Sequence, residues 1–175
     1  MKGFFFVALA LATAAAPRVP RSALVAMERS FDQRIQRANI DDPLDLLGAT
    51  RGIYLEKYGA VFTCEVDLAV TAITPFRPQL SGEEKERLRQ KKLARLGAVK
   101  QLMRDMMVTS ATSLKTMPEN EQVSVGVTFF YRAWELTNGL PSQLVLSAPR
   151  KALVDFEAGR IKAEALNAVI QEQVY

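Results

Sequence analysis

Apolar residues recur every three or four positions along one long stretch in the middle of the chain, Ser81–Leu114. Ser81 and Glu84 stand three positions apart at its start, which is the pattern of a helix capping box. The apolar positions that follow lie on one face of such a helix: Leu96, Val99, Met103, Met106 or Met107, and Leu114. The pattern predicts a long central helix whose apolar face packs on the rest of the protein.

Elsewhere the period changes from helical to alternating. Alternating apolar and polar residues predict four strands, at 53–55, 62–70, 122–135 and 144–148. A short loop containing Gly59 joins the first two, and Asn138-Gly139, typical of tight hairpin turns, separates the last two. We therefore predict an α+β fold: a four-stranded antiparallel sheet built from two β-hairpins, separated by the long central helix, with helices packed on one face.

Further helices are predicted on both sides of this unit. Residues 22–38 form an amphipathic pattern, with Leu24, Phe31 and Ile35 on one side and charged residues, including Arg34 and Arg37, on the other. Asp42-Pro43 suggests a very short helix that ends before Gly48. Two more helices are expected, one from Pro149 to just before Gly159 and one from Lys162 to Gln171. With 175 residues and 49% hydrophobic composition, residues 22–175 are expected to form a single domain.

The first residues have the composition of a secretory signal peptide. Met1–Ala16 combines Lys2, an apolar run and small residues in A-x-A patterns, and residues 17–21 form a linker. The apolar run is shorter than the ~20 residues that a spanning helix needs, although an uncleaved anchor is the alternative. We expect the protein to be exported, to the periplasm or the extracellular space, and expect no transmembrane helix after removal of the signal segment.

Composition restricts the possible chemistry. The chain contains no histidine and one cysteine, Cys64, so Ser-His-Asp and Cys-His catalysis, an intramolecular disulfide and a cysteine-rich zinc site are all excluded within it. Cys64 falls on the apolar side of its strand, which favours a small buried side chain over a reactive thiol. No cofactor and no metal site are predicted.

Two carboxylates make the only candidate catalytic pair. Glu65 and Asp67 share one side of the 62–70 strand, roughly 7 Å apart by strand rise. That spacing suits paired carboxylates in a hydrolase, or oxygen ligands of a cation. The alternative, which we favour, is that they belong to the solvated face of an antiparallel strand.

Basic residues suggest an anion-binding surface. The net charge is +4, and the candidates are Arg89, Lys91, Lys92 and Arg95 on the central helix and Arg150 and Lys151 at the start of a later helix. Such residues can bind phosphate or anionic lipid, or they can form a solvated helix face. No aromatic side chain interleaves with the central-helix cations, so nucleic acid is not an expected partner.

These observations predict an exported, non-enzymatic interaction module or envelope-associated module. Its partner would be a protein or an envelope surface, including an anionic one, bound through the open face of the sheet or the basic helix. The alternative is a carboxylate-dependent hydrolase using Glu65 and Asp67.

Overall fold

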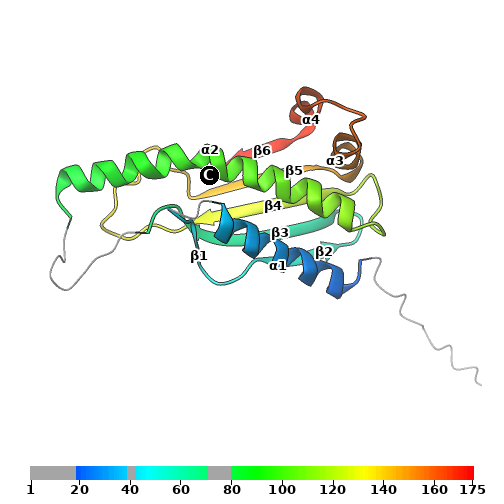
Figure 1. The fold of residues 1–175 in the computed structure, drawn as a ribbon, viewed down its shortest axis with the longest axis horizontal. Helices are drawn as coiled ribbons and strands as arrows, with labels where there is room; N and C mark the ends of the chain where they lie inside the picture. The colour runs from blue at the N-terminus through cyan, green and yellow to red at the C-terminus, as the bar shows by residue number, and fades with distance from the viewer. Residues whose placement is uncertain (1–18, 39–41, 71–79) are drawn as a thin grey trace, which may run out of the picture.

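The computed structural model describes residues 19–38, 42–70 and 80–175 (Figure 1), so the signal-like segment lies outside the described residues. The described residues form four helices and a six-stranded mixed sheet. The helices are α1 (Arg21–Arg37), α2 (Gly82–Ser113), α3 (Arg150–Glu157) and α4 (Ala163–Val169). The strands are β1 (Asp45–Leu46), β2 (Arg51–Leu55), β3 (Gly59–Asp67), β4 (Gln122–Phe129), β5 (Gln143–Pro149) and β6 (Gln171–Val174). The α+β class is confirmed.

The prediction of four antiparallel strands is wrong, because β3 and β4 are parallel. β1 and β2 both pair with β3 along the same edge, and β4, β5 and β6 follow in that order. All pairs other than β3 with β4 are antiparallel. α2 carries the chain back along the sheet between β3 and β4, which is the helical crossover that a parallel pair requires. The long helix therefore joins two neighbouring strands within one sheet.

The second predicted hairpin is only partly correct. β4 and β5 are antiparallel neighbours, but β4 ends at Phe129 and segment 130–142 leaves the sheet. Asn138 and Gly139 do form a turn, in which the Leu140 N–H donates to the Thr137 carbonyl at 2.9 Å. Gly139 has a φ of +77°, whereas Asn138 is not among the described residues with positive φ. The dipeptide thus turns the chain inside a long loop and does not set the strand register.

Two short strands at the sheet margins differ from the prediction, one in place of a predicted helix and one directly after a helix that is present. The expected helix after Asp42-Pro43 is instead β1, whose Leu46 pairs with Val66 of β3. The last helix ends at Val169, and β6 then pairs with β5. Both strands consist of four residues or fewer, so local pattern is too short to reveal them and tertiary pairing decides their conformation.

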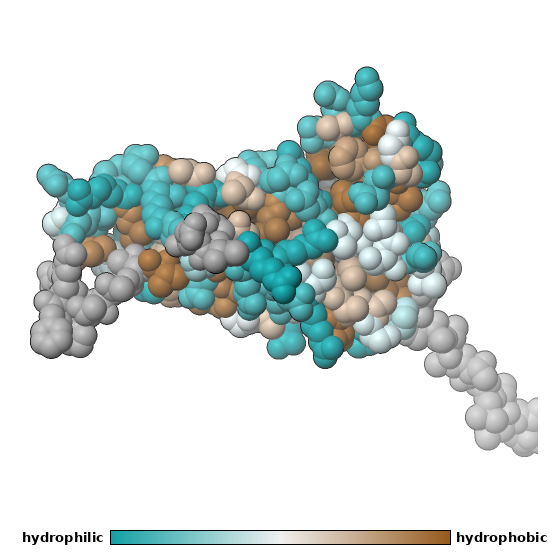
Figure 2. Space-filling view, viewed as in Figure 1, coloured by the Kyte–Doolittle hydropathy of each residue, from teal (hydrophilic) through white to brown (hydrophobic). Residues whose placement is uncertain are grey.

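The core lies between the helices and one face of the sheet. Phe31 of α1 meets Phe62 of β3 in an edge-to-face contact with ring centroids 4.9 Å apart. From α2, Val99 and Met103 are buried over the strands. On the opposite face, Thr63, Glu65 and Thr128 are exposed, and the described helices pack on the other side. Figure 1 shows α1 and α2 on this shared side, and Figure 2 shows largely hydrophilic residues on the outer surface of α2.

α2 begins where the sequence predicts. The Ser81 hydroxyl accepts a hydrogen bond from the Glu84 N–H, and the Glu84 carboxylate accepts one from the Ser81 N–H, so the capping box is confirmed. In the N-terminal part of α2 the one fully buried side chain is that of Lys92, whereas the C-terminal part buries methionines and valines. Among the described helices, none has the length and apolar character needed to cross a membrane.

Candidate functional site

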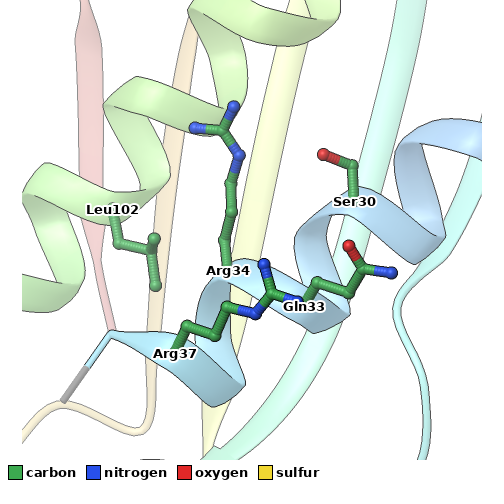
Figure 3. Close-up of a pocket in the computed structure, with 5 residues that line it drawn as sticks. All are labelled: Ser30, Gln33, Arg34, Arg37 and Leu102. Atoms are coloured by element: carbon green, nitrogen blue, oxygen red, sulfur yellow. The ribbon is translucent and has the colours of Figure 1, made fainter. Parts of the chain in front are cut away.

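α1 presents a stripe of polar residues beside its buried face. Ser30, Gln33, Arg34 and Arg37 are spaced by three or four positions, which places them in one row along the helix. Leu102 of α2 lies opposite them and completes a shallow groove of about 340 Å³. Figure 3 shows Arg34 extending from α1 toward α2. We call this concavity, lined by these five residues, the arginine groove.

Helix geometry favours arginine at this end of α1. Arg34 and Arg37 lie in the last turn, where positive charge complements the helix dipole. Within the described part of the chain, neither guanidinium is engaged by a carboxylate. A guanidinium presents a planar set of donors that matches the geometry of a carboxylate or phosphate. The arginine groove can therefore bind an anionic group.

The acids of α1 are occupied elsewhere. Glu28, which is 6% exposed, accepts a hydrogen bond from the Gly52 N–H at 2.7 Å. Asp32 accepts one from the Thr50 N–H at 2.9 Å. Arg21 lies 2.7 Å from Glu28 and also donates to the Gly52 carbonyl. These contacts hold α1 against the edge of β2 and leave no α1 carboxylate facing the groove arginines among the described interactions.

The four candidate cations of α2 all have partners inside the molecule. Arg89 pairs with Glu86 at 2.6 Å and donates to the Asn138 carbonyl, and Lys91 lies 2.8 Å from Asp42. The Lys91 contact, together with Arg95, lowers the pKa of the Asp42 carboxyl. Arg95 pairs with the Asp42 carboxylate and donates to the carbonyls of Leu68 and Asp42. Lys92 is completely buried. These four cations thus make contacts within the protein itself.

Lys92 lies at the centre of a buried ionic cluster. Its Nζ is 2.9 Å from Asp67 Oδ1 and 2.5 Å from Glu135 Oε2, and it lies over the Tyr131 ring at 5.1 Å from the centroid. Arg132 pairs with the other oxygen of Asp67 at 3.0 Å. We call these residues, Asp67, Lys92, Tyr131, Arg132 and Glu135, the Lys92 cluster. Burial, with the nearby Glu135 and Asp67 charges, raises the pKa of Tyr131.

The structure separates the two candidate catalytic carboxylates. Asp67 is 1% exposed, and its oxygens are taken by Lys92, Arg132 and the Ala69 N–H. Glu65, two residues earlier on β3, is exposed to solvent. The expectation that both lie on a solvated face is therefore wrong for Asp67. Because only Glu65 is accessible, the pair does not form one site to which a substrate could bind.

Arg150 and Lys151 also make internal contacts. Arg150 is 9% exposed, and its Nε donates to the Ala111 carbonyl in the last turn of α2 at 2.9 Å. This bond satisfies a carbonyl that has no partner within its own helix. Lys151 pairs with Asp155 at 2.8 Å, and this contact is the main cause of the raised pKa of Lys151 and of the lowered pKa of Asp155.

Cys64 is buried on the core side of β3, and burial raises the pKa of its thiol to about 12. Within the described ranges, no three carboxylate or cysteine side chains lie close enough together to hold a metal ion.

Comparison of the chain with family models, with curated proteins and with solved structures finds no match.

The sequence contains the groove arginines but does not single them out. Arg34 and Arg37 belong to the polar side of the predicted 22–38 helix, as the α2 cations belong to the polar side of theirs. The groove arginines differ from the candidate cations of α2 in one respect: whether a carboxylate that is distant in sequence contacts the side chain. Asp42 and Glu135 reach Lys91 and Lys92 across long sequence separations, which no local pattern reveals.

Proposed function

We propose that the protein is an exported, non-enzymatic module that binds an anionic partner, a protein or an envelope surface, through the arginine groove. The observation that carries this proposal is the contrast between the two basic helices. The four candidate cations of α2, Arg89, Lys91, Lys92 and Arg95, pair with carboxylates within the molecule, while Arg34 and Arg37 lie in a concavity without a carboxylate partner among the described residues. The signal-like Met1–Ala16 segment supports export.

The contacts of Asp67 favour binding over hydrolysis. A general acid or base must come within hydrogen-bonding distance of the atom that gains or loses a proton. The Asp67 carboxylate already holds Lys92 and Arg132 and is shielded from solvent. A hydrolase that relies on Glu65 and Asp67 would have to open the Lys92 cluster before each turnover.

A second binding surface is the open face of the sheet, near the β2–β3 hairpin. Ile53, Leu55 and Tyr58 are 53%, 43% and 46% exposed there. A protein partner with an apolar surface fits this region better than an anionic membrane does. Binding there would persist at high salt, whereas binding through the arginine groove would weaken as ions screen the charges.

The test of the arginine groove measures binding to vesicles. Wild-type protein should bind vesicles that contain phosphatidylglycerol and should not bind neutral phosphatidylcholine vesicles. The double variant Arg34→Glu/Arg37→Glu should bind at least roughly thirtyfold more weakly, since each surface cation contributes about 1 kcal/mol to such binding. Co-sedimentation at low and high salt measures the difference.

The matched control is Lys115→Glu/Lys162→Glu, which changes the net charge by the same amount at exposed positions away from the groove. It should retain most of the wild-type affinity. Equal loss in both double variants would show that net charge alone drives binding, and the groove would then have no specific role. Absence of wild-type binding to anionic vesicles, together with absence of binding to a polyglutamate peptide, would contradict the proposed function.

A further inference from the structure

A second concavity lies on the opposite side of α2 and is lined by residues from its C-terminal half, from α3 and from α4. α3 packs against α2, and α4 packs against α3 (Figure 1). It has a volume of about 160 Å³. It is separate from the arginine groove, since the two concavities share no lining residue. We call it the Arg104 cavity, after the basic residue in its wall.

The inner wall of the Arg104 cavity is apolar. Val108 of α2 is 8% exposed and Leu166 of α4 is 4% exposed, and Phe156 of α3 packs against the same core. All three helices thus contribute apolar side chains, and α4 adds a second one, Ala163. An apolar cavity of about 150 Å³ is known to hold a molecule the size of benzene. The Arg104 cavity therefore has room for a single small ring or a short branched chain.

Arg104 gives the cavity a positive charge. Its Nε atom is buried and, within the described residues, has no hydrogen-bond partner. A buried donor without an acceptor is uncommon in folded proteins and costs free energy until an acceptor is supplied. No described carboxylate forms an ion pair with this guanidinium.

Asp105 also lines the cavity, but its environment differs. Its side chain is exposed to solvent, and its Oδ1 accepts a hydrogen bond from the Gln101 amide at 2.9 Å. Its charge is therefore hydrated and hydrogen-bonded, whereas the Arg104 Nε has no partner among the described residues. Among the described residues that line the cavity, the unsatisfied group is the Arg104 Nε–H donor, so the complementary ligand group is an acceptor, and the charge of Arg104 favours an anionic one.

We propose that the Arg104 cavity binds a small organic carboxylate with an apolar body. The apolar part occupies the space between Val108, Phe156 and Leu166, and the carboxylate accepts hydrogen bonds from Arg104. An inorganic anion would leave the apolar wall unfilled, and a neutral aromatic molecule would leave the guanidinium without an acceptor. The cavity thus selects for both features in one ligand.

Calorimetric titration of the full-length protein with benzoate tests the proposal. Benzoate should bind with a Kd in the millimolar range or tighter. Benzyl alcohol, which has nearly the same shape without the charge, should bind at least tenfold more weakly, and so should inorganic phosphate. This comparison needs no variant and does not depend on whether a substitution perturbs folding.

Variants then locate the binding site. Arg104→Gln should weaken benzoate binding at least tenfold, and Arg104→Lys should weaken it similarly because lysine lacks the planar donors. Arg87→Gln, which removes the same charge from an exposed position on the same helix, should leave the affinity unchanged. Asp105→Asn should not weaken binding, because it removes a negative charge from the cavity wall.

Three results would overturn the proposal: no benzoate binding, equal binding of benzoate and phosphate, or benzoate affinity that is unchanged in Arg104→Gln while thermal unfolding shows the variant to be folded. Because Arg34→Glu/Arg37→Glu leaves the Arg104 cavity intact, its benzoate affinity should equal that of wild type. Failure of vesicle binding and failure of benzoate binding are therefore distinguishable.

Discussion

At the scale of single residues, charge in this protein is largely used internally. Lys92 is fully buried between Asp67 and Glu135, and the Tyr131 ring lies against its ammonium group. Removing ions from water costs several kcal/mol each, so such a cluster is stable only when every charge has its partners. The neighbouring Lys91 makes a solvent-exposed pair with Asp42. Adjacent lysines therefore contribute very differently to folding.

Replacing Lys92 with methionine tests this difference. Lys92→Met should lower the free energy of unfolding by about 3–5 kcal/mol, because it leaves two buried carboxylates without their main counter-ion. Lys91→Met should change it by about 1 kcal/mol or less, as for other exposed ion pairs. Urea unfolding followed by circular dichroism measures both values. Similar effects for the two lysines would contradict the description of Lys92 as the centre of a buried cluster.

At the scale of elements, local sequence patterns predict where the helices lie in the chain better than they predict which residues the helices contact. The capping box and the apolar stripe of α2 follow from spacing alone, and both are present. The N-terminal part of this helix is held by polar bonds to Asp42, Asp67 and Glu135, which come from other parts of the chain. Those partners depend on the sheet topology. The roles of the α2 cations therefore could not be predicted from sequence.

The junction between the first hairpin and β4 depends on a glycine. Gly59 has a φ of +133°, and a Cβ at this position would lie 1.9 Å from the Gln122 carbonyl oxygen. Gly59→Ala should therefore destabilise the protein by roughly 3 kcal/mol or more, through backbone strain and loss of the first β3–β4 pairing. Thermal unfolding measures the change.

Gly139→Ala is the matched control for this prediction. Gly139 also has positive φ, +77°, but nothing lies within 4 Å of a Cβ built there. Its replacement should cost about 1–2 kcal/mol, which is the backbone term alone. If both glycine variants lose the same stability, the contact with Gln122 contributes little and strain explains both.

At the scale of the whole molecule, the α+β class was predictable and the strand order was not. Alternation identifies β3, β4 and β5, but alternation carries no direction, so Thr63 and Gly126 could equally have faced each other in an antiparallel sheet. The direction is set by α2, whose length returns the chain to the start of the sheet. The parallel pairing of β3 and β4 is thus a consequence of the long helix between them, and the sequence pattern does predict that helix.

The stability of the whole protein should fall at the alkaline end of the pH range, through two groups whose pKa is raised by burial, Cys64 and Tyr131. The chain has no histidine, so no side chain of ordinary pKa titrates near neutrality. Burial raises the pKa of Cys64 to about 12, whereas an unfolded cysteine ionises near pH ~8.5. The unfolded state therefore releases this proton first, and stability present below pH ~8.5 is lost as the pH rises toward 12. The raised pKa of Tyr131 acts in the same direction above pH ~10.

Urea unfolding at pH 9 and pH 10.5 should show a decrease of about 2 kcal/mol over this interval, since one pKa unit corresponds to about 1.4 kcal/mol. Cys64→Ala should lose most of this pH dependence while keeping the fold. An equally steep decline in Cys64→Ala would mean that other groups cause it. Stability that is constant from pH 9 to 10.5 in wild type would show that the thiol is not buried as the structure describes.

The contacts between α1 and β2 also limit how copies of this protein can join. Glu28 and Asp32 occupy the outward N–H groups of Gly52 and Thr50, which an added strand would otherwise use. At the other end of the sheet, β6 has exposed residues throughout and pairs only with β5 among the described strands. A sheet that can accept a strand on one side only forms a closed pair by edge contact, whereas a sheet with two free sides can grow into a fibre. We therefore expect edge contact through β6 to produce pairs and not fibres, because the α1 carboxylates oppose strand addition at the β2 edge.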